Sequence, residues 1–559
     1  MDSKTLRQKF IQFFVEKGHK ELKSASLVPE DDPSVLFTTA GMQQFKKFYV
    51  SSKEAPTKNV VTIQPCFRTS DIEEVGDDTH LTFFEMLGNF SFDGYFKKEA
   101  IEYAWEFLTE ILEIDQSRIS ATYYDQEKAK IEIKTDNESK KILEQLKGLE
   151  KIEGQGEDNF WSLGTENSPG GPTVEFYIDN VEIWNLVFNE FVWKGNSWQD
   201  LESKGVDTGM GFERLLTVLQ EKDENYQTDL FWPIIEKIEE ISGKKYTDNQ
   251  KEFRIIADHL KASVFAVSDD VLPSNKERGY IVRRLIRRAI VKGQQLGITN
   301  NFTAKLAEIV FKIYENRYQF NQNNIKNEIQ KEETKFRNTL SNGLKEFEKQ
   351  KQNLTGEIAF NLYQTYGFPW EMTAELAEEN KISVERIDFE NAFKKHQELS
   401  RTASAGMFKG GLAGGGKMET KYHSATHLLL ASLRQILGND IYQKGSNITA
   451  ERLRFDFNYP EKLTNEQIKK VEELVNVNIE KDLPVGMQEM TLEEAKNSGA
   501  MGVFENKYGD KVKVYSIGNF SCEICGGPHV KSTGGLSHFK ILKEESSSAG
   551  VRRIKAVLE

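Results

Sequence analysis

The chain has 559 residues, 38% of them hydrophobic and 29% charged, a balance typical of a soluble globular protein with several domains. No run approaches the ~18 apolar residues of a membrane span, the first residues lack the apolar core of a secretion signal, and three cysteines are too few for a disulfide framework; these features exclude a membrane protein and favour the cytoplasm. The net charge of −13 disfavours a generally basic nucleic-acid-binding protein, although local clusters matter more than the average.

Residues 1–230 mix two kinds of periodicity. β-like runs such as "NVVTIQPCF" (59–67) and "VEIWNLVF" (181–188) alternate with helical runs such as "KEAIEYAWEFLTEIL" (98–112). We expect one mixed α and β domain over this range.

Residues 231–400 are predicted to be mainly helical, because apolar residues recur at spacings of three and four, as in "FWPIIEKIEEIS". The following segment, 401–418, contains five glycines between Gly410 and Gly416 and is predicted to be a linker. Residues 419–559 carry strands and helices and are long enough for an independent α/β domain.

A cluster of positive charge occurs in "NKERGYIVRRLIRRAIVK" (275–292), in which Glu277 is the single acid. Arginines spaced four apart lie on one side of a helix, so the segment predicts a basic ridge that contacts a phosphate backbone. A solvated helix face is the alternative interpretation. The cations are Lys276, Arg278, Arg283, Arg284, Arg287, Arg288 and Lys292.

The pair His423 and His427 has the spacing at which two imidazoles on one helix bind one zinc ion, although such pairs are often incidental. No Glu lies between them to act as the base of a zinc protease. About a hundred residues later, "CEICGGPHV" supplies Cys525 and His529, also four apart. The two half-sites together make a tetrahedral Zn²⁺ site, with Cys522 left as a possible competing ligand.

A domain with these half-sites resembles the editing domain of alanyl-tRNA synthetases and their free-standing relatives. The stretches "GGLAGGGKMETKYHSATHLL", "YQKGS" and "SSAGVRRIKAV" are similar to that domain in the same order. The resemblance implies that Gln443 and Arg552 line the pocket for the 3′ end of a mischarged tRNA, whose ester is hydrolysed beside the zinc.

The first half of the chain resembles the catalytic domain of the same family. Three stretches look like motifs 1, 2 and 3 of a class II synthetase. In this order they are "SLVPEDDPSVLFTTAGMQQFK" (26–46), "PCFRTSDIEEVGDDTHLTFFEMLGNFSFDGYF" (65–96) and "VDTGMGFERLLTVLQ" (206–220). "LPSNKERGYIVRRLIRRAI" is similar to the start of the family's helical tRNA-recognition region.

The resemblance assigns roles to individual residues. Arg68 matches the arginine that binds the α-phosphate, Arg214 the arginine that contacts adenine or the distal phosphates, and Asp207 the carboxylate that pairs with the α-ammonium of alanine; these three are the expected catalytic residues. Asn185, Val187 and Trp161 correspond to the alanine pocket. The expected ATP-binding residues are Arg68, His80, Trp161, Ile183, Trp184, Asn185, Gly211 and Arg214. A core position is the alternative for Trp184.

Two departures from the family pattern stand out. The motif 2 loop after Arg68 is some four residues shorter and lacks the usual lysine. Where the family has Asp, "LYQTYGFPWEMT" has Gln364, which together with Asn275 is expected to read a G·U pair in the acceptor stem. Because an amide both donates and accepts, Gln364 is expected to relax that discrimination, which charging of acceptor-stem variants by the native chain and by Gln364→Asp would measure. The other expected tRNA contacts are Arg278, Arg283, Arg284 and Arg287.

The resemblance therefore predicts a multidomain α+β protein with an antiparallel-sheet catalytic domain, an α-helical tRNA-recognition domain and an α/β zinc-containing editing domain. It implies a ligase that uses ATP with Mg²⁺ to attach alanine to tRNA(Ala), and that hydrolyses Ser- and Gly-tRNA(Ala) at the zinc site. The family's C-terminal coiled coil is not seen after "VRRIKAVLE", so a monomer is expected.

Two other classes fit the sequence less well. A threonyl-tRNA synthetase shares the editing half-sites, but it would carry editing before the catalytic core and a zinc ion in the amino-acid pocket. A non-catalytic or editing-only tRNA-binding paralogue is the second alternative; the shortened motif 2 loop favours it, and the intact Arg68, Asp207 and Arg214 disfavour it.

Overall fold

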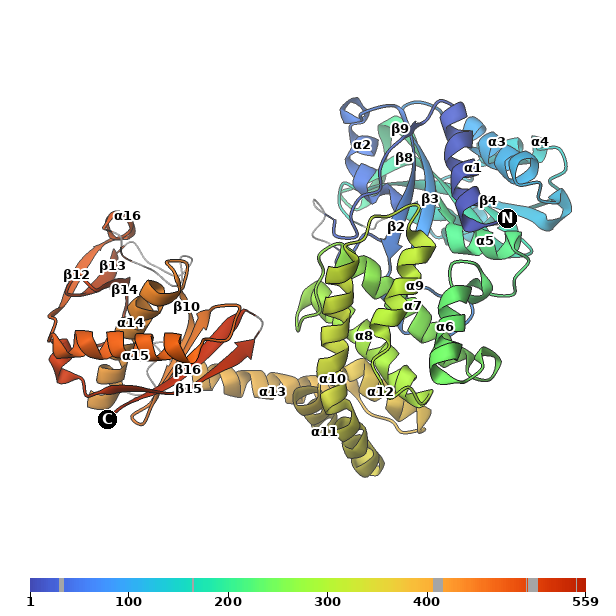
Figure 1. Cartoon of the computed structure of the whole chain (residues 1–559). Helices are drawn as coiled ribbons and strands as arrows, with labels where there is room; N and C mark the ends of the chain where they lie inside the picture. Colours follow the sequence, from blue (N-terminus) through green and yellow to red (C-terminus); the bar gives the residue numbers. More distant parts are fainter. Residues whose placement is uncertain (30–34, 163–164, 406–415, 499, 501–510, 549) are drawn as a thin grey trace. The chain divides into compact units, whose positions relative to one another are not determined.

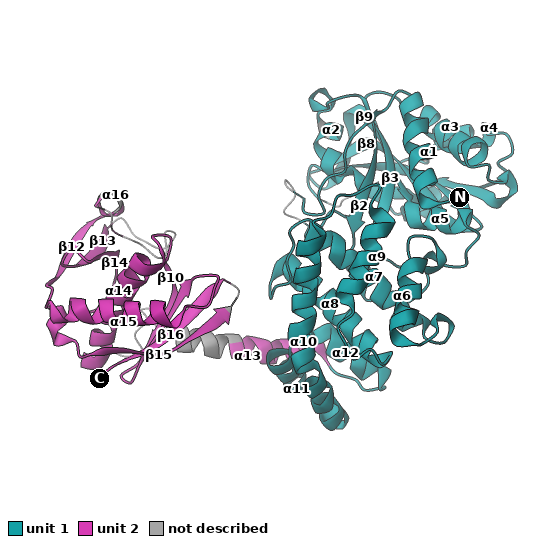
Figure 2. Cartoon of the chain, viewed as in Figure 1, with its two compact units in different colours: residues 1–384 teal, residues 385–559 magenta. Residues whose placement is uncertain are grey.

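The computed structural model describes residues 1–29, 35–162, 165–405, 416–498, 500, 511–548 and 550–559 (Figure 1). The chain forms two compact units, residues 1–384 and residues 385–559 (Figure 2). Each unit buries a hydrophobic core of its own.

A nine-stranded sheet forms the centre of the first unit. Its strand order is β1-β2-β3-β9-β8-β7-β4-β5, and β6 pairs with β7 outside this path. The pairs β1/β2 and β4/β5 are parallel and the other pairs are antiparallel. The strands are β1 (Lys20–Glu21), β2 (Asn59–Phe67), β3 (Phe83–Phe92), β4 (Ile119–Tyr124), β5 (Lys151–Gln155), β6 (Phe160–Ser162), β7 (Pro169–Ile178), β8 (Val181–Lys194) and β9 (Ser197–Gly211).

The two faces of this sheet differ, because successive side chains of a strand point to opposite sides. On β8, Trp184 packs against Phe10 and Phe14 of α1 (Ser3–Glu16), which together with α3 (Lys97–Glu106) covers one face. The neighbouring residues Ile183 and Asn185 therefore lie on the other face. At one end that face is covered by the turn η1 (Gly41–Phe45) and by α2 (Lys46–Val50), whose residues pack with Phe90 and Phe92 of β3.

Helices make up the rest of the first unit. Their apolar residues belong to the same hydrophobic core as those of the sheet. The first residue of this core along the chain is Leu6 and the last is Ala377. The helices are α4 (Asn137–Gln145), α5 (Phe212–Leu219), α6 (Trp232–Ser242), α7 (Gln250–Ser268), α8 (Glu277–Gln295), α9 (Thr303–Tyr314), α10 (Gln322–Gln350), α11 (Gly356–Asn361) and α12 (Trp370–Glu379), with the helical turn η11 (Leu362–Tyr366) between the last two.

The described residues of the second unit form two antiparallel sheets and three longer helices. One sheet has the order β10-β11-β16-β15 and the other β12-β13-β14. The strands are β10 (Gln443–Ile448), β11 (Leu453–Asn458), β12 (Val485–Thr491), β13 (Lys511–Ile517), β14 (Ser521–Ile524), β15 (Phe539–Ser548) and β16 (Val551–Leu558). The helices are α13 (Arg386–Ala405), α14 (Lys417–Leu437), α15 (Asn465–Glu480) and the short α16 (Leu492–Asn497).

The predicted multidomain α+β class is confirmed: a mainly antiparallel sheet, a helical region and a mixed α/β region follow one another along the chain. The division of residues 1–384 at 230 and the boundary at 418 stay predictions. Residues 406–415, which hold most of the predicted linker, and residues 30–34 of the motif 1 stretch lie outside the described residues. Among the described helices, none combines the length and the apolar composition needed to cross a membrane.

Candidate functional site

A cavity opens on the face of the large sheet that α1 and α3 leave free. Five residues that the sequence assigns to nucleotide binding line it, namely Arg68, His80, Ile183, Gly211 and Arg214. They come from the end of β2, the loop that follows it, β8, the end of β9 and the start of α5. The remaining lining residues are Asp71, Thr79, Leu81, Phe84, Met86, Glu182, Gly209, Glu213 and Asn225.

The two arginines of the cavity are held differently. The guanidinium carbon of Arg68 lies 4.8 Å from the ring centre of Phe84, a cation–π contact, and Arg68 has no ion-pair partner among the described residues. Arg214 is exposed, and its Nη1 lies 3.3 Å from the carboxylate of Glu182. Arg68 is thus free to pair with an anionic ligand, and Arg214 can exchange an exposed, low-energy ion pair for one.

His80 lies in the loop between β2 and β3, half-buried at the edge of the cavity. Its Nδ1 is 2.6 Å from Oδ2 of Asp77, and its backbone N–H donates to Oδ1 of the same carboxylate. The contact with His80 and its backbone N–H holds the pKa of Asp77 below its usual value although partial burial opposes this. Asp77 therefore fixes the orientation of the imidazole.

The predicted alanine pocket lies on the cavity face of the sheet. Asn185 is opposite Gly209, and Val187 is opposite Asp207, in the pairing of β8 with β9. Asp207 is 6% exposed and has no hydrogen-bond or ion-pair partner among the described residues. Burial raises the pKa of its carboxyl to about 7. A buried acidic group without a partner is a place for a ligand that brings a positive charge.

Trp161 and Trp184 have different surroundings. Trp161 is half-buried on β6 and packs against the cluster that contains Met42 and Phe45, on the cavity side of the sheet. Trp184 is only 1% exposed and packs against the aromatic rings of α1 on the opposite face. Strand alternation turns the indole away from the cavity, and the contact of Trp184 with nucleotide stays a prediction.

The basic ridge predicted on α8 is not a solvent-exposed ridge. Arg284, Arg287, Arg288 and Lys292 are all buried, with exposures between 1% and 7%. Arg287 binds Glu332, Arg288 binds Glu375, and Lys292 binds Glu375 and Glu379. Acids of neighbouring elements already pair with Arg284 and Arg287, and their contact with tRNA stays a prediction.

Several cations of the helical region hold the loop that follows Arg68. Arg284 pairs with Glu73, Arg288 donates to the carbonyls of Ile72 and Val75, and Arg254 of α7 donates to the carbonyl of Gly76. Nη1 of Arg288 also lies 2.9 Å from Nε2 of His259. The cationic face of α8 therefore supports one wall of the cavity.

The first turn of α8 and the residues just before it remain accessible. Asn275 and Lys276 are exposed, and Arg278 and Arg283 are half-buried. Arg283 donates to the side-chain oxygen of Asn275, and Arg278 to the carbonyl of Leu36. Gln364 is exposed on η11, the turn that ends at Gly367, whose carbonyl accepts from Arg287. Nε of Arg283 also lies 3.3 Å from Glu332, the acid that pairs with Arg287. The contacts of Asn275, Gln364, Arg278 and Arg283 with tRNA stay predictions.

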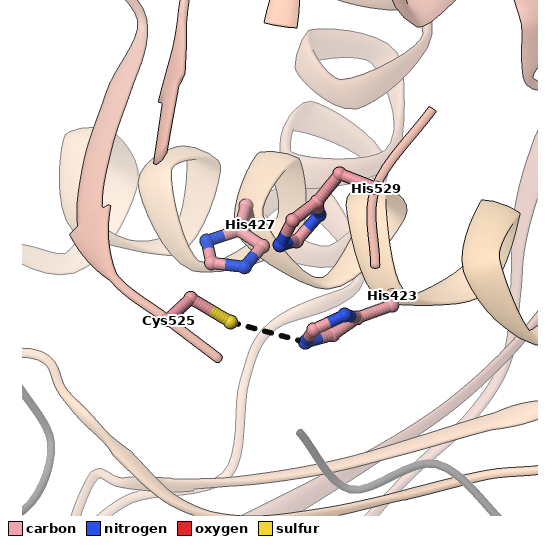
Figure 3. Close-up of side chains that lie close together, drawn as sticks. All are labelled: His423, His427, Cys525 and His529. Carbon is pink, nitrogen blue, oxygen red and sulfur yellow. Dashed lines mark hydrogen bonds between the residues drawn. The ribbon is translucent and has the colours of Figure 1, made fainter. Parts of the chain in front are cut away.

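The four predicted metal ligands come together in the second unit (Figure 3). His423 and His427 lie one turn apart on α14, and Cys525 and His529 follow β14. One donor atom from each of the four lies within 4.8 Å of all the others. The Sγ of Cys525 is 3.4 Å from Nε2 of His423, and two ligands of one tetrahedral zinc ion are roughly 3.3–3.8 Å apart.

The Nδ1 atom of each imidazole is held by a group outside the cluster. For His423 it lies 3.1 Å from the carbonyl of Pro528, for His427 2.9 Å from Glu523, and for His529 3.2 Å from the hydroxyl of Ser424. The Nε2 atoms are left to face the interior, and that of His529 is buried without a hydrogen-bond partner among the described residues. Metal-binding histidines in proteins are held in this way.

The surroundings of the cluster also favour a cation. A Cβ on Gly527 would lie 2.1 Å from the His423 ring, so only glycine lets the chain pass this close to the cluster. Burial alone would raise the pKa of the Cys525 thiol, but the three imidazoles around the sulfur lower it to about 3. Burial opposes the charged form of His427, but Glu523 and Cys525 raise its pKa to about 10. The site therefore attracts positive charge, and its soft sulfur and imidazole donors suit zinc.

Gln443 and Arg552, the residues expected to line an editing pocket, belong to the four-stranded sheet of the same unit. Phe457 of β11 pairs with Gln443 on one side and with Arg552 on the other, so both lie in one row across the sheet. Gln443 donates to the hydroxyl of Ser446, and the buried Arg552 pairs with Glu544. The core of this unit joins the sheet to α14, which carries the two histidines.

Three polar residues of these sites were not singled out from the sequence. Glu523 stands two residues before Cys525, and strand alternation gives a signal for it, since both side chains then point the same way. Glu182, which pairs with Arg214, and Glu175, which contacts Asn185, gave no such signal. Their roles depend on strand register, which no local pattern reveals.

Comparison with known proteins identifies the family of the chain. A family model described as "tRNA synthetases class II (A)" matches residues 5–429, and one described as "Threonyl and Alanyl tRNA synthetase second additional domain" matches residues 512–555. An alanine–tRNA ligase of Treponema denticola is 48% identical over 99% of this chain and 98% of its own length. That of Borrelia hermsii is 45% identical over 99% of both chains, and that of Fusobacterium nucleatum is 36% identical over 99% of this chain and 79% of its own. The chain belongs to the alanine–tRNA ligase family of class II tRNA synthetases.

Proposed function

We propose that the chain activates alanine with ATP, transfers it to tRNA(Ala), and hydrolyses wrongly charged tRNA at the His/Cys cluster of the second unit. The observation that carries the first activity is on one face of the large sheet. Arg68 lines the cavity there and has no anionic partner among the described residues. Asp207 does not line the cavity but lies on the same face, two residues before Gly209, and has no cationic partner among the described residues. Alanine and ATP bring the missing charges.

In the activation step, a carboxylate oxygen of alanine attacks the α-phosphorus of ATP, and pyrophosphate leaves with its electron pair. Arg68 is placed to bind the α-phosphate, and it offsets the charge that builds up there. Arg214 can leave Glu182 and bind adenine or the distal phosphates. Asp207 binds the α-ammonium and so aligns the carboxylate for attack, with Asn185 and Val187 beside the methyl group. We propose Mg²⁺ as the partner of the ATP phosphates.

The transfer step passes the alanyl group from the adenylate to a ribose hydroxyl at the 3′ end of the tRNA, and AMP leaves. We propose that the accessible residues around the start of α8, Asn275, Arg278 and Arg283, together with Gln364, contact the acceptor stem. Phosphate contacts by such cations position the RNA, and amide side chains read base edges.

A second site is needed because a pocket for a methyl side chain cannot strongly exclude glycine or serine. Discrimination by one small group is limited to about 10–200-fold. We propose that His423, His427, Cys525 and His529 hold a zinc ion, which would polarise the ester of the mischarged tRNA and a water molecule. Gln443 and Arg552 would bind the 3′ end of the tRNA through hydrogen bonds and charge.

ATP–pyrophosphate exchange with alanine, serine, glycine and threonine tests the activation. We expect alanine to support the fastest exchange and serine and glycine to support slower exchange. If none of the amino acids supports exchange, the activation of alanine is disproved and an editing-only protein is the interpretation that remains.

His427→Ala tests the second activity. Exchange should stay at the native rate, because the exchange cavity lies in the other compact unit, while Ser-tRNA(Ala) should accumulate in charging reactions. Native deacylation by this variant would rule out the cluster as the editing site. The expected cytoplasmic location and monomeric state stay predictions, and sedimentation measures the second.

A further inference from the structure

Glu175 lies in the first unit at the edge of the proposed alanine pocket. It belongs to β7, where it pairs directly with Asn185 of β8, and its side chain is buried at 6% exposure. Its two carboxylate oxygens have different partners. Oε1 accepts from Nδ2 of Asn185 at 2.7 Å, and Oε2 accepts from the hydroxyl of Tyr177 at 2.5 Å.

This pairing fixes which way the amide of Asn185 points. An ionised carboxylate only accepts hydrogen bonds, so the amide must turn its NH₂ group towards Glu175. The carbonyl oxygen of Asn185 then points away from Glu175, and it is buried without a hydrogen-bond partner among the described residues. Such an acceptor costs about 1–3 kcal/mol unless a donor satisfies it.

The strand register indicates what could supply that donor. Asn185 is opposite Gly209, which lines the cavity, and Asp207 lies two residues before Gly209 on the same face. Diagonal neighbours in a sheet are about 7–8 Å apart, so one small ligand can lie between Asn185 and Asp207. Two buried acceptors without donors, one neutral and one acidic, match a primary ammonium group with its three N–H bonds.

We infer that Glu175 is a positioning residue for the amino-acid substrate: it turns the oxygen of Asn185 towards the ammonium group that Asp207 binds. Glu175 does not contact the substrate itself. The inference rests on the proposed activation of alanine and adds a residue that selects for the ammonium end of the substrate.

The inference requires an ionised Glu175. Burial is the main cause that raises the pKa of this carboxyl, the hydrogen bond from the Tyr177 hydroxyl opposes it, and the carboxylates of Glu182 on β8 and Asp158, near β6, add to it; together they bring the pKa to about 7. Tests at about pH 8 therefore keep Glu175 ionised. They also avoid the range in which a protonated Glu175 would donate to Asn185 and turn its amide.

The variant Glu175→Gln tests the positioning role. Its amide presents a donor on one side, so the amide of Asn185 no longer has a single favoured orientation. We expect the KM for alanine in ATP–pyrophosphate exchange to rise about five- to tenfold, with the KM for ATP and the melting temperature close to native.

Tyr177→Phe is the matched control, because it removes the other hydrogen bond of the same carboxylate and leaves the acceptor of Asn185 in place. Since that hydrogen bond lowers the pKa of Glu175, both variants are compared at about pH 9, where Glu175 stays ionised without it. Its KM for alanine should stay within about twofold of native. Equal increases of the KM for alanine in Glu175→Gln and Tyr177→Phe, or a parallel increase of the KM for ATP, would show a merely structural role and overturn the inference.

A double-mutant cycle with Asn185→Ala gives a second readout. If Glu175 acts through Asn185, then Glu175→Gln should raise the KM for alanine no further in the Asn185→Ala background. If the two substitutions together raise the KM for alanine by the product of their separate increases, the inference is overturned. The failure of this inference differs from that of the proposed function: native protein without alanine-dependent exchange defeats both, whereas native exchange with an unchanged KM in Glu175→Gln defeats the inference alone.

Discussion

Residues at the His/Cys cluster have two roles. Some direct a donor atom into the interior of the cluster, and others hold the imidazoles in place from outside it. Among the latter, Glu523 carries a charge, and it is itself held by the hydroxyl of Ser521 at 2.8 Å. A carboxylate on Nδ1 of a ligand histidine fixes its tautomer and increases its basicity at Nε2. Glu523 should therefore raise the affinity of the site for a metal ion without contacting the ion.

Glu523→Gln should weaken zinc binding about 10–100-fold, because the amide keeps a hydrogen bond to His427 but loses the charge. Titration with a zinc-binding chelator measures this affinity directly. Glu472→Gln is the control: Glu472 lies in the same unit and accepts from the backbone of Ile541. An unchanged affinity in Glu523→Gln would show that the carboxylate plays no part in the site.

A second prediction at this scale concerns Asp207. The carboxylate must be ionised to bind an ammonium group, and burial raises its pKa to about 7. The kcat/KM for alanine in exchange should therefore fall as the pH falls below about 7, since this ratio reports the free enzyme. Asp207→Asn should lower kcat/KM about 10–100-fold at pH 8 and leave only the part of the fall that comes from protonation of Glu175. A native profile that stays flat down to pH 6 would contradict this role.

The sequence was informative for residues whose spacing is local. The pair His423 and His427 and the pair Cys525 and His529 each lie within one turn or loop, so their chemistry can be seen in a short window. The partners of Asn185 and Arg214 could not be predicted, because Glu175 and Glu182 reach them through β-sheet pairing and a strand-end contact. Register of that kind depends on the whole sheet.

At the scale of elements, the helix α8 was predicted correctly, but the exposure of its basic side chains was not. Periodicity predicted the helix, and the structure has it from Glu277 to Gln295. The spacing of its arginines also predicted one exposed ridge, which is wrong because α10 and α12 bring Glu332, Glu375 and Glu379 against it. Periodicity separates apolar from polar faces, and it cannot show that a polar face is buried in ion pairs.

The two ends of this segment should therefore respond differently to substitution. Arg288→Met leaves the half-buried Glu375 with one cation fewer and removes two hydrogen bonds to the motif 2 loop. We expect a loss of about 3–5 kcal/mol in the free energy of unfolding of the first unit, and an increased KM for ATP in variants that stay folded. Urea denaturation and exchange kinetics measure the two effects.

Lys276→Met is the matched substitution at the exposed end of the segment. Stability should stay within about 0.5 kcal/mol of native, and the affinity for tRNA should fall modestly. If Lys276→Met destabilises the fold as much as Arg288→Met does, burial does not explain the difference between the two cations.

At the scale of the whole molecule, the chain has two main cores that share no residue. The core that spans Leu6 to Ala377 belongs to the first unit, and the core that spans Tyr422 to Leu558 belongs to the second. A cooperative unfolding transition reflects one core, so two transitions are expected on heating. The helices of residues 231–384 share the core of the sheet, and the division of the chain lies between residues 384 and 385. The boundaries at 230 and 418 stay predictions.

Metal removal should act on one of these transitions only. A zinc-binding chelator should lower the melting temperature of the second unit by roughly 5–10 °C, since binding energy at a structural metal site contributes to folding. The transition of the first unit and alanine-dependent exchange should not change. Calorimetry with and without chelator, followed by addition of Zn²⁺, gives the comparison, and a shift of both transitions would contradict the assignment.

Three arginines hold the loop that follows Arg68. Arg254 and Arg288 donate to its backbone carbonyls, and Arg284 pairs with its Glu73 side chain. Ordering a free backbone costs about 1–2 kcal/mol for each residue. In this chain that conformational entropy is lost when the helices fold, before any nucleotide arrives. Binding of ATP therefore meets a preorganised loop, and more of the attraction between arginine and phosphate is left to stabilise the complex.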